Sequence, residues 1–421
     1  MFAPPRFALT GCRLLDGGGG DHTGVTILVE QGRIVAAEPG LAVPSDYPVR
    51  FDLVGRTVMP GLIDTHTHLV GAEPLPYGDY ATSRRLGEPE GLHALRSVEA
   101  ARRTLLAGTT TVRVVGCRDY LDVHLREAVR DGMVIGPRIV ASGLGITPTG
   151  GHVHWRCRNA DGEDQVRQAV REHVARGVDW IKVMGVTGGL ASPGQDPRLP
   201  QYRFEEVQAA VDEAHRWGRY VAAHAHARAG MENAVRAGVD TLEHGSFLDD
   251  ELAEGMARQG AWLVPTLTVN YFLDPARSGG SLPPAQVARM RELEAMGFTV
   301  PSYQDRMRLA RTHGVPVATG TDAGGNALFR HGSVGIEMLM LAECGYSAHE
   351  AIQAATGQAA RALRLENVTG FVRKGLQADL LVVGADPLQD LRALVTGESA
   401  ARIEGVIAAG RLVRWDAQDL I

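Results

Sequence analysis

Short apolar runs alternate with helical patterns through the middle of the chain, and this alternation restricts the fold more than any other feature of the sequence. Strand candidates lie at 61–69, 109–116, 138–146, 180–186, 220–227, 241–246, 262–269 and 316–324. The segments between them, such as LHALRSVEAARRTLLAG and FEEVQAAVDEAHRWG, carry apolar residues three and four positions apart and a glycine near the end, as amphipathic helices do. Eight strands joined by crossover helices predict an α/β fold, a (β/α)₈ TIM barrel.

The two ends of the chain differ from the middle. Runs such as GVTILVEQGRIVAAEPG near the start and GLQADLLVVGADP near the end are rich in Val, Ile and Leu and broken by Gly, Asp and Pro, which predicts short strands. We therefore expect a small β-sandwich domain built from both termini, residues 1–58 and 370–421, and a barrel of residues 59–369. A doubly wound open sheet competes for the middle, but nothing resembling GxGxxG follows its first strand.

The overall composition excludes several classes of function. The chain of 421 residues has a net charge of -6 and no cluster of basic residues, so we expect no nucleic-acid partner. Its four cysteines form no CxxC pair, which argues against a disulfide framework or a cysteine-rich zinc site. No apolar run approaches the ~18 residues of a membrane span, and the start does not resemble a secretory signal. A cytoplasmic enzyme acting on a small molecule is the expectation, and assembly as a homo-oligomer stays open.

Unusual polar residues recur near the C-terminal ends of five strand candidates. In chain order they are His66 and His68 in HTH, Lys182 in WIKVMG, His224 in HAHA, His244 in EHG, and Asp322 in TDAG. In a barrel these strand ends converge at one mouth, where enzymes of this fold place their chemistry. The two histidines of HTH project to one face of their strand, which suits a divalent metal.

Each of these residues also has a structural interpretation. A single histidine is often a hydrogen-bonded core residue, Asp322 before Ala-Gly-Gly could be a turn residue, and Lys182 could belong to a buried ion pair. Their joint placement at the same end of the predicted strands favours a site. The histidines of helical and loop patterns are expected on the surface or in packing: His93, His124, His173, His215, His313 and His349.

Lys182 is the strangest of the candidates. The chain contains only two lysines, Lys182 and Lys374, and all its other basic side chains apart from histidine are arginines. One of these two lysines stands in the middle of an apolar strand, where a charged amine is costly.

At these residues the chain resembles the amidohydrolase superfamily over nearly its whole length. The motifs that carry the resemblance are VMPGLIDTHTHL, EHGSFLD, LVPTLTV, TGTDAGG, AIQAATGQAARAL and GLQADLLVVGADPL. The branch it resembles contains Xaa-Pro dipeptidases and imidazolonepropionase-like amidohydrolases, on the segments IKVMGVTGG and VAAHAHARAGMENAVRAGVDTLEHG.

The resemblance implies two divalent metal ions. His66, His68 and Asp322 would hold the inner ion, and His224 and His244 the outer one, while Lys182, N-carboxylated by CO₂, would bridge both. A buried amine readily loses its proton, and the resulting carbamate is an anion, so its burial is no longer costly. Zinc suits these ligands, and manganese, cobalt, nickel or iron are alternatives. Asp322 would act as general base and then acid for a metal-bridged hydroxide.

Substrate contacts are also implied by the resemblance. His152 in TPTGGHVHW and His226, two residues beyond His224, are expected to bind substrate. In strand 2, where relatives commonly have an acid after Arg113, this chain has Val114, so Arg113 is left as a structural or a substrate-facing charge. The roles of His154, Tyr77 and Arg330 stay open.

The function expected from all of this is hydrolysis of a C–N amide bond in a dipeptide or N-acyl amino acid. Hydrolysis of a cyclic amide or lactone, or deamination, on the same metal site is the alternative, although mononuclear deaminases of the superfamily lack the bridging lysine. A non-catalytic binding or scaffold protein would be expected to lack ligands, and none of the six is missing.

Overall fold

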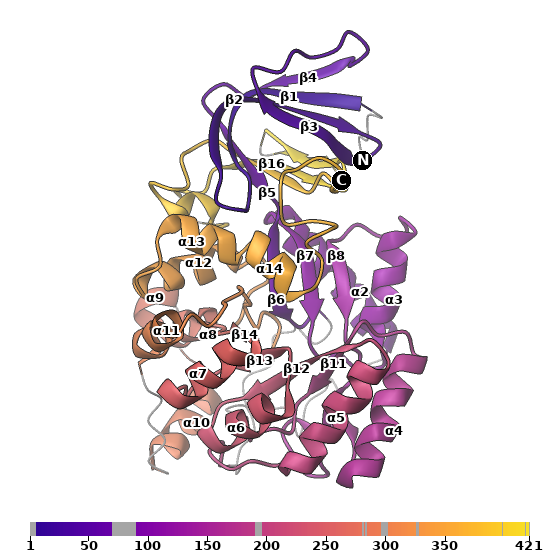
Figure 1. Cartoon of the computed structure of the whole chain (residues 1–421), viewed down its shortest axis with the longest axis vertical. Helices are drawn as coiled ribbons and strands as arrows, with labels where there is room; N and C mark the ends of the chain where they lie inside the picture. Colours follow the sequence, from indigo (N-terminus) through magenta and orange to yellow (C-terminus); the bar gives the residue numbers. More distant parts are fainter. Residues whose placement is uncertain are drawn as a thin grey trace.

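A computed structural model of the chain shows two parts arranged along the long axis of the molecule (Figure 1). The structure describes residues 6–69, 90–189, 196–279, 282, 284–295, 302–325, 328–397, 399–416 and 418–420. The smaller part, at the top of Figure 1, contains strands from both ends of the chain, and the larger part contains the alternating strands and helices. Tyr77 lies outside the described residues.

The smaller part is one sheet to which both ends of the chain contribute. Its N-terminal strands are β1 (Arg6–Leu15), β2 (Asp21–Glu30), β3 (Arg33–Pro39), β4 (Val49–Asp52) and β5 (Thr57–Pro60). Its C-terminal strands are β15 (Leu380–Val383), β16 (Ile403–Ala408), β17 (Arg411–Trp415) and β18 (Gln418–Asp419). The strand order is β18-β17-β16-β15-β5-β1-β2-β3, with β4 beside β1. The two ends of the chain meet where β5 pairs antiparallel with β15.

A shared apolar core holds this sheet together. Phe7, Ile27 and Val58 from the N-terminal segment belong to the same buried cluster as Leu380 and Ile407 from the C-terminal segment. Neither segment could bury these side chains alone, so the predicted small β domain built from both termini is confirmed. Its predicted limits, at 58/59 and 369/370, stay predictions.

The larger part contains short parallel strands in two sheets. The first is β6-β7-β8, and the second is β10-β9-β11-β12-β13-β14. Their bounds are β6 (Leu62–Thr67), β7 (Thr109–Val114), β8 (Arg138–Ala141), β9 (Gly145–Thr147), β10 (Arg158–Asn159), β11 (Trp180–Val183), β12 (Tyr220–Ala225), β13 (Thr241–His244) and β14 (Trp262–Val264). The predicted third strand, 138–146, is therefore divided into β8 and β9, one in each sheet.

The predicted eighth strand, 316–324, closes the barrel without forming a regular strand. On one side its backbone pairs with β14, where the Ala318 amide donates to Leu263 O at 3.1 Å. On the other side it pairs with β6, where the Thr65 amide donates to Thr319 O at 2.9 Å. Isolated bridges at Val317 and Ala323 mark the same two edges. The barrel predicted from the sequence is thus confirmed.

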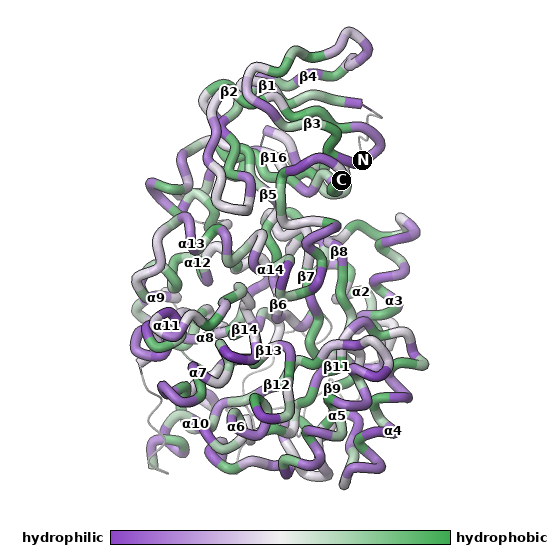
Figure 2. The backbone as a smooth tube through the Cα atoms, viewed as in Figure 1, coloured by the Kyte–Doolittle hydropathy of each residue, from purple (hydrophilic) through white to green (hydrophobic). Residues whose placement is uncertain are grey.

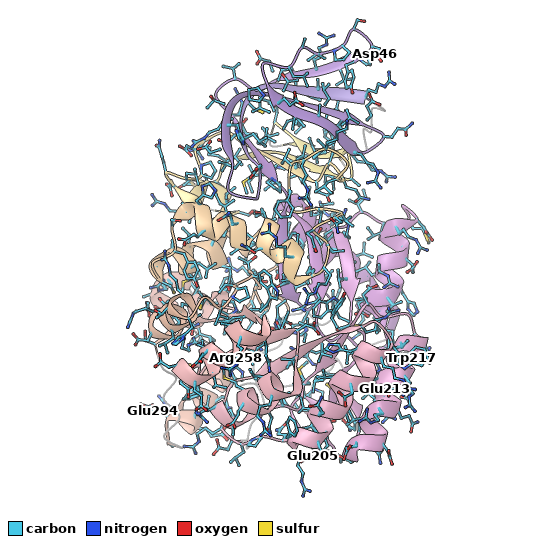
Figure 3. The ribbon with its side chains drawn as sticks, in the orientation of Figure 1. Asp46, Glu205, Glu213, Trp217, Arg258 and Glu294 are labelled. Atoms are coloured by element: carbon cyan, nitrogen blue, oxygen red, sulfur yellow. The ribbon has the colours of Figure 1, made fainter. Side chains whose placement is uncertain are left out.

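Helices surround the barrel and complete the crossovers. They are α2 (Glu90–Leu106), α3 (Leu121–Arg130), α4 (Gly162–Ala175), α5 (Phe204–Arg216), α6 (Arg228–Ala237), α7 (Asp250–Gln259), α8 (Thr268–Leu273), α9 (Pro275–Ser278), α10 (Pro284–Ala295), α11 (Tyr303–Thr312), α12 (Val334–Glu343), α13 (Ala348–Ala354) and α14 (Gly357–Ala362). Along many of them hydrophilic and hydrophobic positions alternate (Figure 2), and charged side chains such as Glu205 and Glu294 lie at the edge of the molecule (Figure 3). No helix in the described ranges is both long enough and apolar enough to cross a bilayer.

An apolar floor fills the N-terminal end of the barrel. Trp180, Ala222 and Val264 belong to one buried cluster with residues of α14. Side chains two residues apart along a strand point the same way, so Lys182 lies above Trp180 on β11, and His224 lies above Ala222 on β12. The polar side chains of the next layer, which include Lys182 and His224, therefore lie at the C-terminal mouth of the barrel, above the apolar layer.

Candidate metal centre

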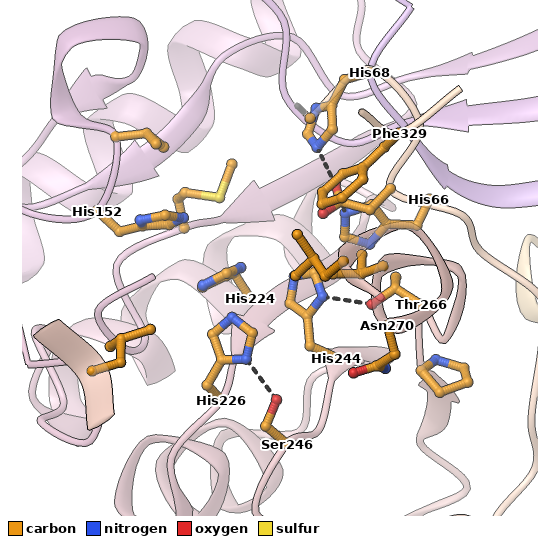
Figure 4. Close-up of a pocket in the computed structure, with 18 of the residues that line it drawn as sticks. His66, His68, His152, His224, His226, His244, Ser246, Thr266, Asn270 and Phe329 are labelled. Carbon is orange, nitrogen blue, oxygen red and sulfur yellow. Dashed lines mark hydrogen bonds and ion pairs between the residues drawn. The ribbon is translucent and has the colours of Figure 1, made fainter. Parts of the chain in front are cut away.

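A cavity of about 270 Å³ opens at the C-terminal ends of the barrel strands. It is lined by all the residues that the sequence singled out as metal ligands or substrate contacts: His66, His68, His152, Lys182, His224, His226, His244 and Asp322. Figure 4 shows the histidines pointing toward one another from different strands. Apolar side chains, among them Met184, Leu273 and Phe329, form other parts of the wall.

His66, His68 and Asp322 form the first group of possible ligands. Nε2 of His68 lies 3.0 Å from Oδ1 of Asp322, and Nε2 of His66 lies 3.4 Å from the same oxygen. Burial by itself would raise the pKa of Asp322, but the two histidines hold it well below its ordinary value. The carboxylate is therefore anionic at neutral pH, as a metal ligand must be.

His224, His226 and His244 form the second group, and their ligand atoms all lie within 4.8 Å of one another. The ring of His224 is 4.6 Å from that of His244 and 4.7 Å from that of His226 between centroids. The pKa of His224 is lowered well below its ordinary value, mainly by burial, so its imidazole is neutral and able to bind a cation. His226, which the sequence assigned to substrate binding, therefore lies about as close to His224 as the second predicted ligand, His244, does.

Lys182 lines the same cavity and is completely buried. Its Nζ has no hydrogen-bond partner among the described residues. Burial lowers the pKa of the amine to about 8, which the charges of Glu243 and Asp322 only partly oppose. A lone buried amine is the costly arrangement that the sequence indicated, and it is what N-carboxylation would relieve.

The Nδ1 atoms of four histidines are already engaged. The partners are Glu243 Oε2 for His66 at 2.6 Å, Gly116 O for His68 at 3.0 Å, Ser246 Oγ for His226 at 2.8 Å and Thr266 Oγ1 for His244 at 2.8 Å. Such bonds fix the ring orientation and leave Nε2 for another partner, as in histidines that bind metals. Nε2 of His224 is buried without a partner among the described residues. The donor set therefore fits two divalent cations.

Unusual backbone conformations aim two of the candidates. His244 has φ +71° and Asp322 has φ +55°, a left-handed region that is costly for residues other than glycine. Glu243 and His244 are neighbours on β13, so a regular strand would point them to opposite faces. The turn at His244 allows both to serve the site, Glu243 below the cavity and His244 in its wall.

Glu243 is the site residue that sequence reasoning missed. It is completely buried and lies between His66 and Arg113, whose Nη2 donates to Glu243 Oε1 at 2.8 Å. Burial would raise the pKa of Glu243, but the Arg113 guanidinium and His66 lower it to about 2. Arg113 also donates to Thr65 O at 2.7 Å and packs on the Trp180 ring at 4.4 Å. It is therefore a structural charge that supports the site. The segment TLEHG contained the signal, an acid beside a candidate ligand.

We expect Glu243→Gln to weaken metal binding and to lower kcat/KM by about 10–100-fold, the usual cost of losing the hydrogen-bond partner of a metal-binding histidine. The amide keeps the shape but removes the anion between His66 and Arg113. Metal affinity is measured by competition with a chelator. Asp250→Asn is the matched control, because Asp250 is an exposed acid paired with His313 at 2.8 Å, and it should change neither quantity. Unchanged metal affinity in Glu243→Gln would contradict this supporting role.

The two predicted substrate contacts stack on different histidines. The His152 ring stacks on His224 at 4.3 Å between centroids, and His226, itself a member of the second group, stacks on His244 at 4.7 Å. Gly189 makes room for His152, since a Cβ there would come within 1.7 Å of the imidazole. His154 lies in a short helical turn, η1 (His154–Arg156), and Arg330 is exposed. Neither of these two is among the described residues that line the cavity.

Histidines that the sequence assigned to packing or the surface are found there. His173 is buried, and its Nε2 bonds to Leu144 O at 2.8 Å. His215 and His313 make ion pairs at 2.9 Å and 2.8 Å with Asp240 and Asp250. None of the three lines the cavity, so their ordinary interpretation is confirmed.

Comparisons with known proteins agree with this geometry. Ochratoxinase of Aspergillus niger is 31% identical over 366 residues, which cover 80% of this chain and 72% of that protein. Imidazolonepropionase of Rhizorhabdus wittichii is 28% identical over 399 residues, 85% of this chain and 87% of that one. The crystal structure of a Xaa-Pro dipeptidase with bound methionine in the active site superposes with a TM-score of 0.83 at 31% identity, over 97% of this chain and 100% of that one. The model of the Amidohydrolase family matches residues 57–413. The chain thus belongs to the amidohydrolase family, and it is a hydrolase.

Proposed function

We propose that the protein is a metal-dependent hydrolase that cleaves a C–N amide bond in a dipeptide or N-acyl amino acid. The observation that carries this proposal is Lys182, a buried amine without a hydrogen-bond partner in the described part of the chain, in a cavity lined by imidazoles and one carboxylate. N-carboxylation would give it two anionic oxygens. The proposed ligands are His66, His68 and Asp322 for one cation and His224 and His244 for the other, with carboxylated Lys182 between the two.

The roles of the chain's own residues follow from their surroundings. Two divalent cations bound here, zinc first among the candidates, would polarise the scissile carbonyl and lower the pKa of a water molecule. Asp322, held anionic by His66 and His68, accepts a proton from that water and delivers it to the leaving nitrogen. His152 and His226, which line the cavity beside His224 and His244, hold the substrate. The apolar wall limits the water that reaches the reacting bond.

The relatives support an amide substrate and give a reason for a second candidate. Ochratoxinase and the Xaa-Pro dipeptidase are equally similar to this chain in sequence, each at 31% identity. A dipeptidase cuts an amide bond between two amino acids, which is the reaction proposed here. Imidazolonepropionase is the less similar relative, at 28% identity, and it favours hydrolysis of a cyclic amide or lactone as the second candidate.

The test combines metal analysis with a substrate screen. We expect about two divalent ions per chain, as in binuclear hydrolytic sites, and turnover of Xaa-Pro dipeptides or N-acyl amino acids. A chelator should abolish the activity and added metal should restore it. Metal at this level with turnover of cyclic amides or lactones only would favour the second candidate. Absence of bound metal, together with no turnover of any of these compounds, would contradict both hydrolase candidates. It would favour a non-catalytic binding or scaffold protein.

A further inference from the structure

Positive charge exceeds negative charge in the cavity wall. Among the described lining residues outside Lys182 there are two arginines, Arg156 and Arg306, and the only carboxylate is Asp322. Asp322 belongs to the proposed metal centre, so it does not neutralise either guanidinium. Arg156 is partly exposed and can be solvated by water. Arg306 cannot, because its exposed fraction is 5%.

Arg306 lies on α11, behind the second histidine group. Its Nη1 donates to the carbonyl oxygen of His244 at 3.2 Å. Its Nε is buried and has no hydrogen-bond partner among the described residues. Burial lowers the pKa of Arg306 to about 10, so it remains a cation at neutral pH. A buried cation held by one carbonyl is an expensive arrangement in a folded protein.

The other buried arginines in the described part of the chain show what Arg306 lacks. Arg113 has a carboxylate partner in Glu243 at 2.8 Å, and Arg289 has one in Glu292 at 2.7 Å. No described carboxylate forms an ion pair with Arg306. A guanidinium presents its donors as a planar fork that matches a carboxylate in two parallel hydrogen bonds. An anion that enters the cavity would supply this partner.

We propose that Arg306 binds the α-carboxylate of the amino acid on the leaving-nitrogen side of the scissile amide, and so restricts the substrates to those with a free carboxylate at that position. The inference rests on the proposed function. A dipeptide and an N-acyl amino acid share this one anionic group, on the carbon next to the scissile nitrogen. It must therefore lie close to the metal centre, and Arg306 contacts the backbone of His244, one of the proposed ligands.

The experiment compares paired substrates in the wild type and in Arg306→Met, which keeps a flexible, unbranched apolar stem, shorter than that of arginine, and removes the charge. Each substrate is used as the free acid and as the carboxamide, for example N-acetyl amino acids and their amides. We expect the wild type to prefer the acid by roughly 100-fold or more, and Arg306→Met to lose that preference by lowering kcat/KM for the acid alone, since truncating one partner of a buried charge pair is costly. Arg306→Lys should recover only part of it, because lysine lacks the fork.

Arg308→Met is the matched control. Arg308 is on the same helix, its side chain is 70% exposed, and it pairs with Asp305, so its substitution should leave the acid preference unchanged. Metal content and thermal unfolding of all variants are measured on the same samples. A second readout does not depend on turnover: calorimetric binding of L-proline and L-methionine, each against its carboxamide. Arg306→Met should bind the acid and the amide equally weakly.

Failure of this inference differs from failure of the proposed function. If the wild type hydrolyses acid and carboxamide equally well, or Arg306→Met keeps the full preference, the assignment of Arg306 is wrong although amide hydrolysis stands. If the wild type hydrolyses neither form of any pair, the proposed function fails with it. If Arg306→Met does not fold, the acid preference of the wild type and of Arg306→Lys still decides whether Arg306 binds the carboxylate.

Discussion

Replacing Lys182 with alanine is expected to remove most of the bound metal and to lower kcat/KM by about 10³-fold or more, because a divalent cation supplies several kcal/mol of transition-state stabilisation. On the proposed function, the substitution removes the carbamate that would give one anionic oxygen to each cation. Lys182→Arg should lose as much, since a guanidinium stays protonated and cannot be carboxylated. Metal content by mass spectrometry and kcat/KM are measured together.

Lys374→Ala is the control, because Lys374 is the other lysine of the chain and is exposed. It should behave as the wild type. In Lys182→Ala, acetate or propionate should partly restore metal and activity by entering the space that the side chain leaves, whereas the larger side chain of Lys182→Arg should prevent this. Full activity of Lys182→Arg would show that no carbamate bridges the site.

The same lysine predicts how the metal-free protein recovers. On the proposed function, the neutral amine nitrogen would attack the carbon of CO₂ and lose one proton to form the carbamate, so recovery would need the unprotonated amine. Burial lowers the pKa of Lys182 to about 8, which leaves more neutral amine at pH 7 than an ordinary lysine has. Reconstitution with metal should therefore accelerate with bicarbonate and as the pH rises through about 8. Lys182→Ala should show no response to bicarbonate.

Asp322→Asn is expected to lower kcat by about 10²–10⁴-fold, the usual contribution of a general acid–base group. The amide keeps an oxygen facing His66 and His68 but cannot carry a proton from water to the leaving nitrogen. His66 and His68 hold the pKa of Asp322 well below its ordinary value against the effect of burial. The carboxylate is thus ionised at neutral pH and becomes protonated only as the pH falls through that lowered pKa. The acidic limb of the kcat/KM profile that it causes should disappear in the variant.

Metal content separates the two roles of Asp322. Activity is compared per bound metal ion, so that loss of a ligand is not counted as loss of the base. A variant that retains both its metal and its kcat would exclude Asp322 as the proton carrier and assign it to metal binding only.

Most of the barrel was predictable because its strands are buried on both faces and read as continuous apolar runs. The segment at 138–146 was predicted as one strand, but the chain breaks between Ala141 and Gly145, where the Asp122 carboxylate accepts the Ser142 and Gly143 amides at 2.9 Å and 2.8 Å. The segment at 316–324 was predicted as a regular strand, but Asp322 takes a left-handed conformation near its end. Both departures come from backbone bonds to distant residues, which no local pattern records.

The candidate ligands could be found because strand order brings their ends to one mouth. Glu243 and Arg306 could not be found in the same way. Glu243 shares its strand with His244, and only the left-handed turn at His244 lets both side chains serve one site. Arg306 stands in a helical pattern, where an arginine is ordinarily a solvated residue, and its burial depends on how α11 packs beside α7 and the end of β13.

The sequence by itself determined the barrel, the β domain joined from both termini, and the set of imidazole, carboxylate and amine groups at the strand ends, because these follow from hydrophobic period and from the direction of parallel strands. Only the tertiary structure decided which charges are neutralised. It gave Arg113 a buried carboxylate and left Lys182 and Arg306 without one among the described residues. The cost of a buried charge depends on its neighbours in space, and those neighbours come from parts of the chain far apart in the sequence.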